Sequence, residues 1–96
     1  MQEELLEPEE LEALIKKFPK WAHQDGSLHQ EFQFHDFAEA FGFMRKVAEI
    51  AEDLDHHPDW FNSWNRVSIS ISTHSAGGLT ALDRKFVEKV ESLEGF

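Results

Sequence analysis

The sequence predicts an α+β domain with the element order α-β-β-α-β-β-α, in which a four-stranded antiparallel sheet has helices packed on one face. Two pairs of short alternating segments, each pair joined by a turn signal, indicate hairpins, and helix-period apolar stripes lie before, between and after them. Strands joined as hairpins pair antiparallel and must bury one face against helices. The 96 residues are expected to form one domain over 1–96, because so short a chain supports a single core.

The first helix is expected over residues 8–17. Pro8 suits the first helical position, and acidic residues in the first turn with lysines in the last complement the helix dipole. The apolar residues recur at helical spacing, at Leu11, Leu14, Ile15 and Phe18. Pro19 ends the helix.

The two hairpins are expected at residues 21–34 and 60–73. Asp25-Gly26 is a two-residue turn signal, because glycine tolerates the positive φ that tight hairpins need. The second hairpin is expected to turn at Asn65-Arg66. In its second strand, apolar or β-branched residues alternate with polar ones: Val67, Ile69, Ile71 and Thr73.

The long helix is expected over residues 36–54, with Asp36 as its cap and Glu39 three residues later as a capping-box partner. Two apolar rows run along it: Phe37, Phe41, Met44, Ala48 and Ala51, and beside them Ala40, Phe43, Val47, Ile50 and Leu54. So wide a stripe predicts deep burial against a sheet. Because Pro58 disfavours helix before it, the chain is expected to turn at His56-His57.

The last helix follows a loop at residues 75–78. Thr80 is expected to cap it, with Asp83 at the third helical position. Leu82, Phe86, Val90 and Leu93 form its inner face.

The charge balance gives a formal net charge of −10, and there is no basic stripe, so direct nucleic-acid binding is not expected. The chain has no cysteine, which excludes disulfides and thiolate chemistry. The acidic N-terminus lacks the pattern of a signal peptide, and no segment approaches the roughly 20 apolar residues of a membrane span. We therefore expect a cytoplasmic protein without a membrane segment. Nine Phe and three Trp suit a core or a surface for a partner subunit.

The candidate chemistry gathers at Glu52, Asp55, His56 and His57, with His74 further along the chain. Glu52 and His56 are four residues apart at a helix end, so their side chains should share one face. The carboxylate and the helix C-terminus would then favour the protonated form of His56 and leave His57 neutral as a base. Two titratable groups in different protonation states are what acid–base catalysis near neutral pH requires.

Two other interpretations of these residues are open. A His-His pair before proline can serve only as a helix C-terminal cap. The same residues with His74 and Asp83 are also metal-ligand types, but their spacing matches no strong zinc pattern, and adjacent histidines in an extended chain point opposite ways. Residue chemistry alone leaves the capping and catalytic interpretations both open.

The spacing of the whole set resembles the pterin-4a-carbinolamine dehydratase family. The family signature is matched by Glu52-x3-His56-His57-Pro58, then Trp64, His74 and Asp83. Further similar runs are Asp36-Phe37-x3-Phe41-Gly42-Phe43-Met44, Asp55-His56-His57-Pro58-Asp59-Trp60-Phe61-Asn62 and Ser72-Thr73-His74. The resemblance extends from about Trp21 to the last helix, with little distinctive similarity before Trp21.

The resemblance implies a dehydratase that removes water from 4a-hydroxytetrahydropterin, giving quinonoid dihydropterin in tetrahydrobiopterin recycling, with no metal or organic cofactor. It implies catalytic roles for His56, His57 and His74. It implies substrate contacts from Glu52, Asp55, Ser72, Thr73 and Ser75, although Ser75 replaces an acidic residue of the animal protein. Asp83 would orient His74 from behind.

The resemblance also implies partners. The substrate is a small pterin, supplied by an aromatic amino acid hydroxylase that is a candidate partner, and the chain is expected to form a homodimer or homotetramer. The alternative is a non-catalytic dimerisation or accessory module with the same fold. Retention of all three histidines argues against that alternative, because partner binding alone does not need them.

Overall fold

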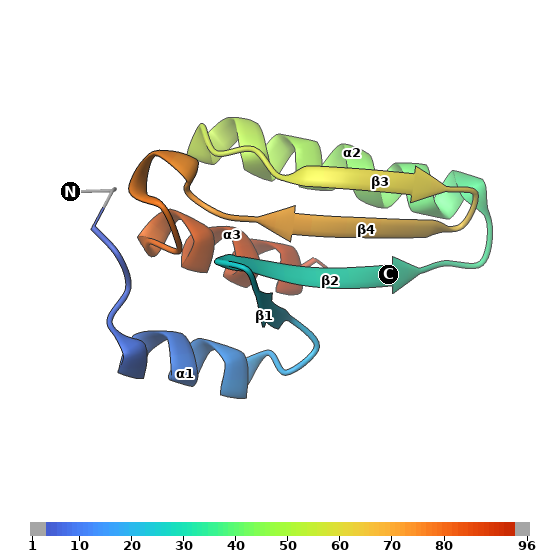
Figure 1. The fold of residues 1–96 in the computed structure, drawn as a ribbon. Coiled ribbons are helices and arrows are strands. Elements are labelled where there is room, and N and C mark those ends of the chain that lie inside the picture. Colours follow the sequence, from blue (N-terminus) through green and yellow to red (C-terminus); the bar gives the residue numbers. More distant parts are fainter. Residues whose placement is uncertain (1–3, 94–96) are drawn as a thin grey trace.

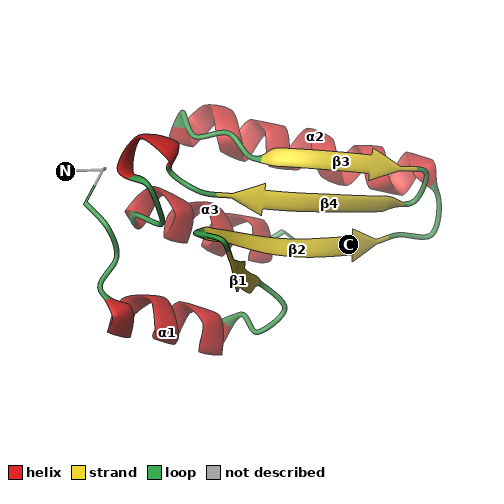
Figure 2. Ribbon diagram, in the orientation of Figure 1, coloured by secondary structure: helices red, strands yellow, loops and turns green. Residues whose placement is uncertain are grey.

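The computed structural model describes residues 4–93 and confirms the predicted element order (Figures 1 and 2). Three α-helices and four antiparallel strands lie within that range, together with a short 3-10 turn, η1. Their bounds are α1 Pro8–Lys17, β1 Ala22–Gln24, β2 Ser27–Gln33, α2 Phe37–Leu54, β3 Asp59–Ser63, β4 Arg66–Ile71, η1 His74–Ala76 and α3 Ala81–Glu91.

The sheet has the strand order β1-β2-β4-β3, so β2 and β4 are central and β3 is an edge strand. In the central pair, Leu28 lies opposite Ile71 and Phe32 opposite Val67. Because side chains on a strand alternate between faces, this register puts the apolar residues of both strands on one face. Polar residues such as Ser68 lie on the other face, which no helix covers in Figure 1.

The core lies between that apolar face and two helices, α2 and α3, which contact each other behind the sheet in Figure 1. Its most deeply buried members include Leu28, Phe43, Val47, Val67, Ile69, Ile71, Phe86 and Val87. The remaining helix, α1, lies beyond the β1 edge and adds Leu14 to the core. Oε2 of Glu10 in α1 lies 3.9 Å from Nη1 of Arg84 in α3. The predicted packing on one face is therefore confirmed for α2 and α3, with α1 flanking them.

One of the two predicted apolar rows of α2 is buried over most of its length, and the other is fully buried only at its C-terminal end. Ala40, Phe43, Val47 and Ile50 face the core, and Ala51 of the other row is buried as well. Phe37 and Phe41 of that row are 47% and 50% exposed and stack on each other. The prediction of deep burial is therefore wrong for these two aromatic residues, because a helix on a single sheet covers about one face only. Although α2 has 18 residues, none of the helices within residues 4–93 combines the length and apolarity needed to cross a membrane.

The first hairpin turns at Asp25-Gly26 as predicted, both residues having positive φ. The second turns one residue earlier than expected, at Trp64-Asn65, and β4 begins at Arg66. The side-chain amide of Asn62 donates to the backbone carbonyls of Trp64 and Arg66 and stabilises this turn. Trp64 consequently lies at the tip with a positive φ, exposed rather than in the core.

Candidate active site

The candidate site is built on a reversal of the chain at the end of α2. Asp55 adopts the left-handed conformation, with φ 50° and ψ 46°, and the backbone N–H of His56 donates to the carbonyl of Ala51 at 3.0 Å. A left-handed residue at this position ends a helix and satisfies its last carbonyls. The helix is thus capped at this corner, but by the backbone of Asp55 and His56 and not by the histidine side chains. Both imidazole rings remain free for other contacts.

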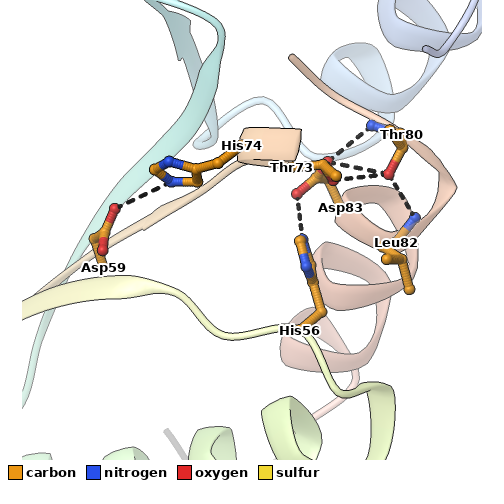
Figure 3. Close-up of polar contacts among 7 residues, drawn as sticks. All are labelled: His56, Asp59, Thr73, His74, Thr80, Leu82 and Asp83. Carbon is orange, nitrogen blue, oxygen red and sulfur yellow. Dashed lines mark hydrogen bonds and ion pairs between the residues drawn. The ribbon is translucent and has the colours of Figure 1, made fainter. Parts of the chain in front are cut away.

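The reversal brings His56 against the first turn of α3. Its Nε2 lies 2.7 Å from Oδ1 of Asp83, and the two side chains are only 10% and 0% exposed (Figure 3). An ionised carboxylate only accepts hydrogen bonds, so this contact places a hydrogen on Nε2 of His56. In a neutral ring Nδ1 is then the nitrogen that can accept a proton.

Asp83 is held by donors on its other oxygen as well. Oδ2 accepts from the hydroxyl of Thr73 at 2.7 Å and from the backbone N–H of Thr80 at 2.8 Å. The second of these bonds is half of the capping box of α3, which confirms Thr80 as its cap. One buried carboxylate therefore both starts a helix and fixes an imidazole.

The other two histidines face carboxylates in solvent. Nε2 of His57 lies 2.6 Å from Oε2 of Glu52, with side chains 54% and 77% exposed. Nε2 of His74 lies 3.8 Å from Oδ2 of Asp59, and in Figure 3 its ring points toward Asp59 and away from His56. Exposed pairs of this kind contribute little to stability, so these two rings remain available for chemistry.

Two predicted pairings are wrong. Glu52 contacts His57 rather than His56, and Asp83 contacts His56 rather than His74. The four-residue spacing places side chains on one face only while the helix continues. Since α2 ends at Leu54 and Asp55 reverses the chain, His56 leaves the helix face and His57 returns to it.

A cavity of about 350 Å³ brings the predicted residues together. Every residue predicted for the site lines it except Glu52 and Asp83, which instead contact two of the lining histidines. The lining residues are Asp55, His56, His57, Ser72, Thr73, His74, Ser75 and Leu82. Its volume falls within the range of small-molecule sites, roughly 300–1,000 Å³.

Three features of the cavity were not predicted. Leu82, which was predicted for the inner face of the last helix, is only half-buried and supplies an apolar wall of the cavity instead. Nothing in the spacing indicates Asp59 as the partner of His74. The hydroxyl of Thr73 is buried and donates to Asp83, so this predicted substrate contact is directed away from the cavity.

The arrangement supplies imidazoles in two different environments around one cavity. His56 is nearly buried against a buried carboxylate, whereas His57 and His74 are open to water. Groups in such different surroundings can donate and accept protons in the same reaction. Within residues 4–93, no group of three or more histidine, aspartate or glutamate side chains is arranged to hold a metal ion.

Comparison with known proteins gives a match over nearly the whole chain. The family model described as "Pterin 4 alpha carbinolamine dehydratase" matches residues 4–93, so the match also includes the segment before Trp21, contrary to expectation. A Prochlorococcus marinus protein named "Putative pterin-4-alpha-carbinolamine dehydratase" is 45% identical over 89 residues, which cover 93% of this chain and 94% of the relative.

Two solved structures share the fold. A Brucella melitensis protein described as a transcriptional coactivator/pterin dehydratase is 39% identical, with a TM-score of 0.88 over 96% of this chain and 100% of its own. A pterin dehydratase-like protein described as a RuBisCO assembly factor in the alpha-carboxysome is 22% identical, with a TM-score of 0.65 over 79% of this chain and 90% of its own. The second likeness shows the fold alone.

Proposed function

The chain belongs to the pterin-4a-carbinolamine dehydratase family, and from this premise we propose that it dehydrates 4a-hydroxytetrahydropterin to quinonoid dihydropterin by histidine acid–base catalysis. The single observation that carries the proposal is the convergence of His56, His57 and His74 on one cavity. A module that only binds partners has no need for three imidazoles around a cavity of this size.

The reaction needs two proton transfers at neighbouring atoms. The bond between C4a and the hydroxyl oxygen breaks, and that oxygen takes a proton and leaves as water. The adjacent ring nitrogen loses a proton, and its electron pair forms the new double bond to C4a. One group must therefore donate a proton while another accepts one, and imidazole does either near neutral pH.

We assign one of these transfers to His56. Its Nε2 is occupied by Asp83, so Nδ1 is the atom that exchanges a proton with the substrate. When the ring takes up a proton, its Nε2 lies 2.7 Å from the buried carboxylate of Asp83. The carboxylate then stabilises the imidazolium as the acid of a catalytic triad stabilises its histidine. The remaining transfer falls to His57 or His74, which reach the cavity from the exposed side.

The other cavity residues are proposed to bind the pterin. Asp55, Ser72 and Ser75 line the cavity and offer a carboxylate and hydroxyls to a polar heterocycle. Glu52 acts through His57, which it contacts at 2.6 Å. Thr73 lines the cavity but is not assigned a polar contact with the pterin, because its hydroxyl already donates a hydrogen bond to Asp83.

The test is the rate at which purified protein removes the absorbance of 4a-hydroxytetrahydropterin, measured with and without a chelator. The proposal expects acceleration over the uncatalysed reaction that is unchanged by the chelator, because protons are moved by side chains. Absence of acceleration by the folded protein would count against the dehydratase. Loss of activity with the chelator would point to metal-assisted chemistry instead.

We also propose that the protein forms a homo-oligomer through an aromatic edge, defined as Phe37, Phe41, Trp60, Phe61 and Trp64. These side chains are all between 38% and 65% exposed. They lie on α2 and on β3 with its following turn, and β3 pairs within the described chain only with β4. An exposed edge strand flanked by aromatic rings is a surface that another chain can cover by strand pairing and apolar burial.

A further inference from the structure

We propose that Thr80 is a positioning residue for the His56–Asp83 pair, acting through the hydroxyl of Thr73. This inference rests on the proposed function for its catalytic consequence, but its structural content concerns only these four side chains. Thr80 does not line the cavity, and it is completely buried. Any effect of its hydroxyl on turnover must therefore pass through other residues.

The two threonine hydroxyls lie in series. Oγ1 of Thr80 is 2.8 Å from Oγ1 of Thr73, which is in turn 2.7 Å from Oδ2 of Asp83. Each hydroxyl has one hydrogen, and that of Thr73 is used on the carboxylate. The hydrogen between the two threonines therefore comes from Thr80, whose direct distance to Oδ2 is a longer 3.5 Å.

This direction of donation makes a chain from Thr80 through Thr73 and Asp83 to His56. A hydroxyl that accepts a hydrogen bond becomes a better donor, so Thr80 strengthens the bond from Thr73 to Asp83. Fixing Oδ2 on Thr73 fixes the carboxylate plane and thereby directs Oδ1 at Nε2 of His56 (Figure 3). The same Oγ1 of Thr80 also accepts from the backbone N–H of Leu82 at 3.2 Å.

The backbone of Thr80 is anchored independently of its side chain. Leu5 forms an antiparallel bridge with Thr80, and the N–H of Leu6 donates to the carbonyl of Leu79 at 2.8 Å. The N–H of Thr80 donates to Asp83 by itself. Removing only the hydroxyl should consequently leave the chain path in place, so that Thr80→Val removes the hydrogen-bond chain together with the cap contact to Leu82.

The experiment compares wild type, Thr80→Val and Thr80→Ser by pterin turnover and by NMR of the His56 ring nitrogens. In Thr80→Val we expect kcat to fall about tenfold with KM changed less than about twofold, as for partners that orient a functional group through hydrogen bonds. The Nε2–H signal of His56 should broaden or disappear. Thr80→Ser, which keeps the hydroxyl, should restore both.

A matched control separates positioning from a general loss of a helix cap. Asp36 caps α2 by accepting from the N–H of Glu39 at 2.9 Å and does not line the candidate cavity. Asp36→Ala, measured at the same temperature interval below its own unfolding midpoint, should leave kcat and the His56 signal unchanged.

Two results would overturn the positioning role. One is a Thr80→Val protein with wild-type kcat and an unchanged His56 signal. The other is a Thr80→Ser protein as impaired as Thr80→Val, which would assign the effect to the methyl group. If wild type shows no pterin turnover, the proposed function fails, and the His56 signal in the three proteins alone decides the positioning role.

Discussion

Nε2 of His56 lies 2.7 Å from Oδ1 of Asp83, and both side chains are nearly or fully buried at the junction of α2 and α3. His57 and His74 also face carboxylates, but those pairs are exposed. The buried pair therefore has its geometry fixed by the fold. The two exposed histidines are free to adjust to a ligand.

Asp83→Asn is expected to lower kcat by roughly 100-fold, a typical contribution of one acid–base group. An amide has a single acceptor oxygen. If that oxygen serves Thr73 and Thr80, the NH₂ faces Nε2 of His56 and forces the hydrogen of the neutral ring onto Nδ1. NMR of the ring nitrogens should show this change of tautomer, and an Asp83→Asn protein with the Nε2–H form and full turnover would disprove the assigned role.

His74→Ala is expected to reduce turnover while leaving the free energy of unfolding within about 0.5 kcal/mol of wild type, because the side chain is exposed. The matched variant Asp59→Asn removes the partner at 3.8 Å and should change turnover much less, since an exposed pair contributes at most about 1 kcal/mol. Chemical denaturation and steady-state kinetics check both. Equal losses in the two variants would mean that Asp59 is needed to orient His74.

Substitutions of Asp55 can distinguish its role in the backbone turn from its proposed role in substrate binding. Asp55 has a positive φ, which destabilises a residue that carries a Cβ by about 1–2 kcal/mol. This destabilisation is smaller for aspartate than for alanine. Asp55→Ala should therefore lower the free energy of unfolding by about 1 kcal/mol, whereas Asp55→Gly should stay close to wild type. If the carboxylate contacts the pterin, both variants raise KM. An unchanged KM in Asp55→Gly would remove Asp55 from the proposed substrate contacts.

The aromatic edge is tested by adding charge to it. Phe41→Glu and Phe61→Glu should shift the wild-type oligomer to monomer in analytical ultracentrifugation, because association would bury a carboxylate. Ala13→Glu on the exposed face of α1 adds the same charge elsewhere and should not change the mass. A wild type that sediments as a monomer would contradict the oligomer proposal outright.

The sequence predicted the elements well because their signals are local. Pro8 and Thr80 mark helix starts, Asp25-Gly26 marks a hairpin, and the alternation in β4 marks its buried face, all as observed. The site residues could be collected from their spacing and the family resemblance. Once the predicted fold forms, it brings most of these residues together around one cavity.

The pairing of the site residues could not be predicted because it depends on one backbone conformation. A left-handed Asp55 turns His56 away from Glu52 and places His57 against it, and nothing in Glu52-x3-His56 indicates that the helix stops between Glu52 and His56. The spacing from Thr80 likewise predicts the place of Asp83 in the capping box of α3, as observed. The sequence did not show that its second oxygen would face an imidazole from an element 27 residues away.

The most direct test of histidine acid–base catalysis is the turnover of 4a-hydroxytetrahydropterin by wild type and His57→Ala. His57 is exposed, so its removal should leave the fold intact, and His35→Ala provides a control at another exposed histidine outside the cavity. We expect a loss of about 100-fold or more in His57→Ala and wild-type turnover in His35→Ala. Wild-type turnover by His57→Ala would contradict histidine acid–base catalysis as proposed for this site.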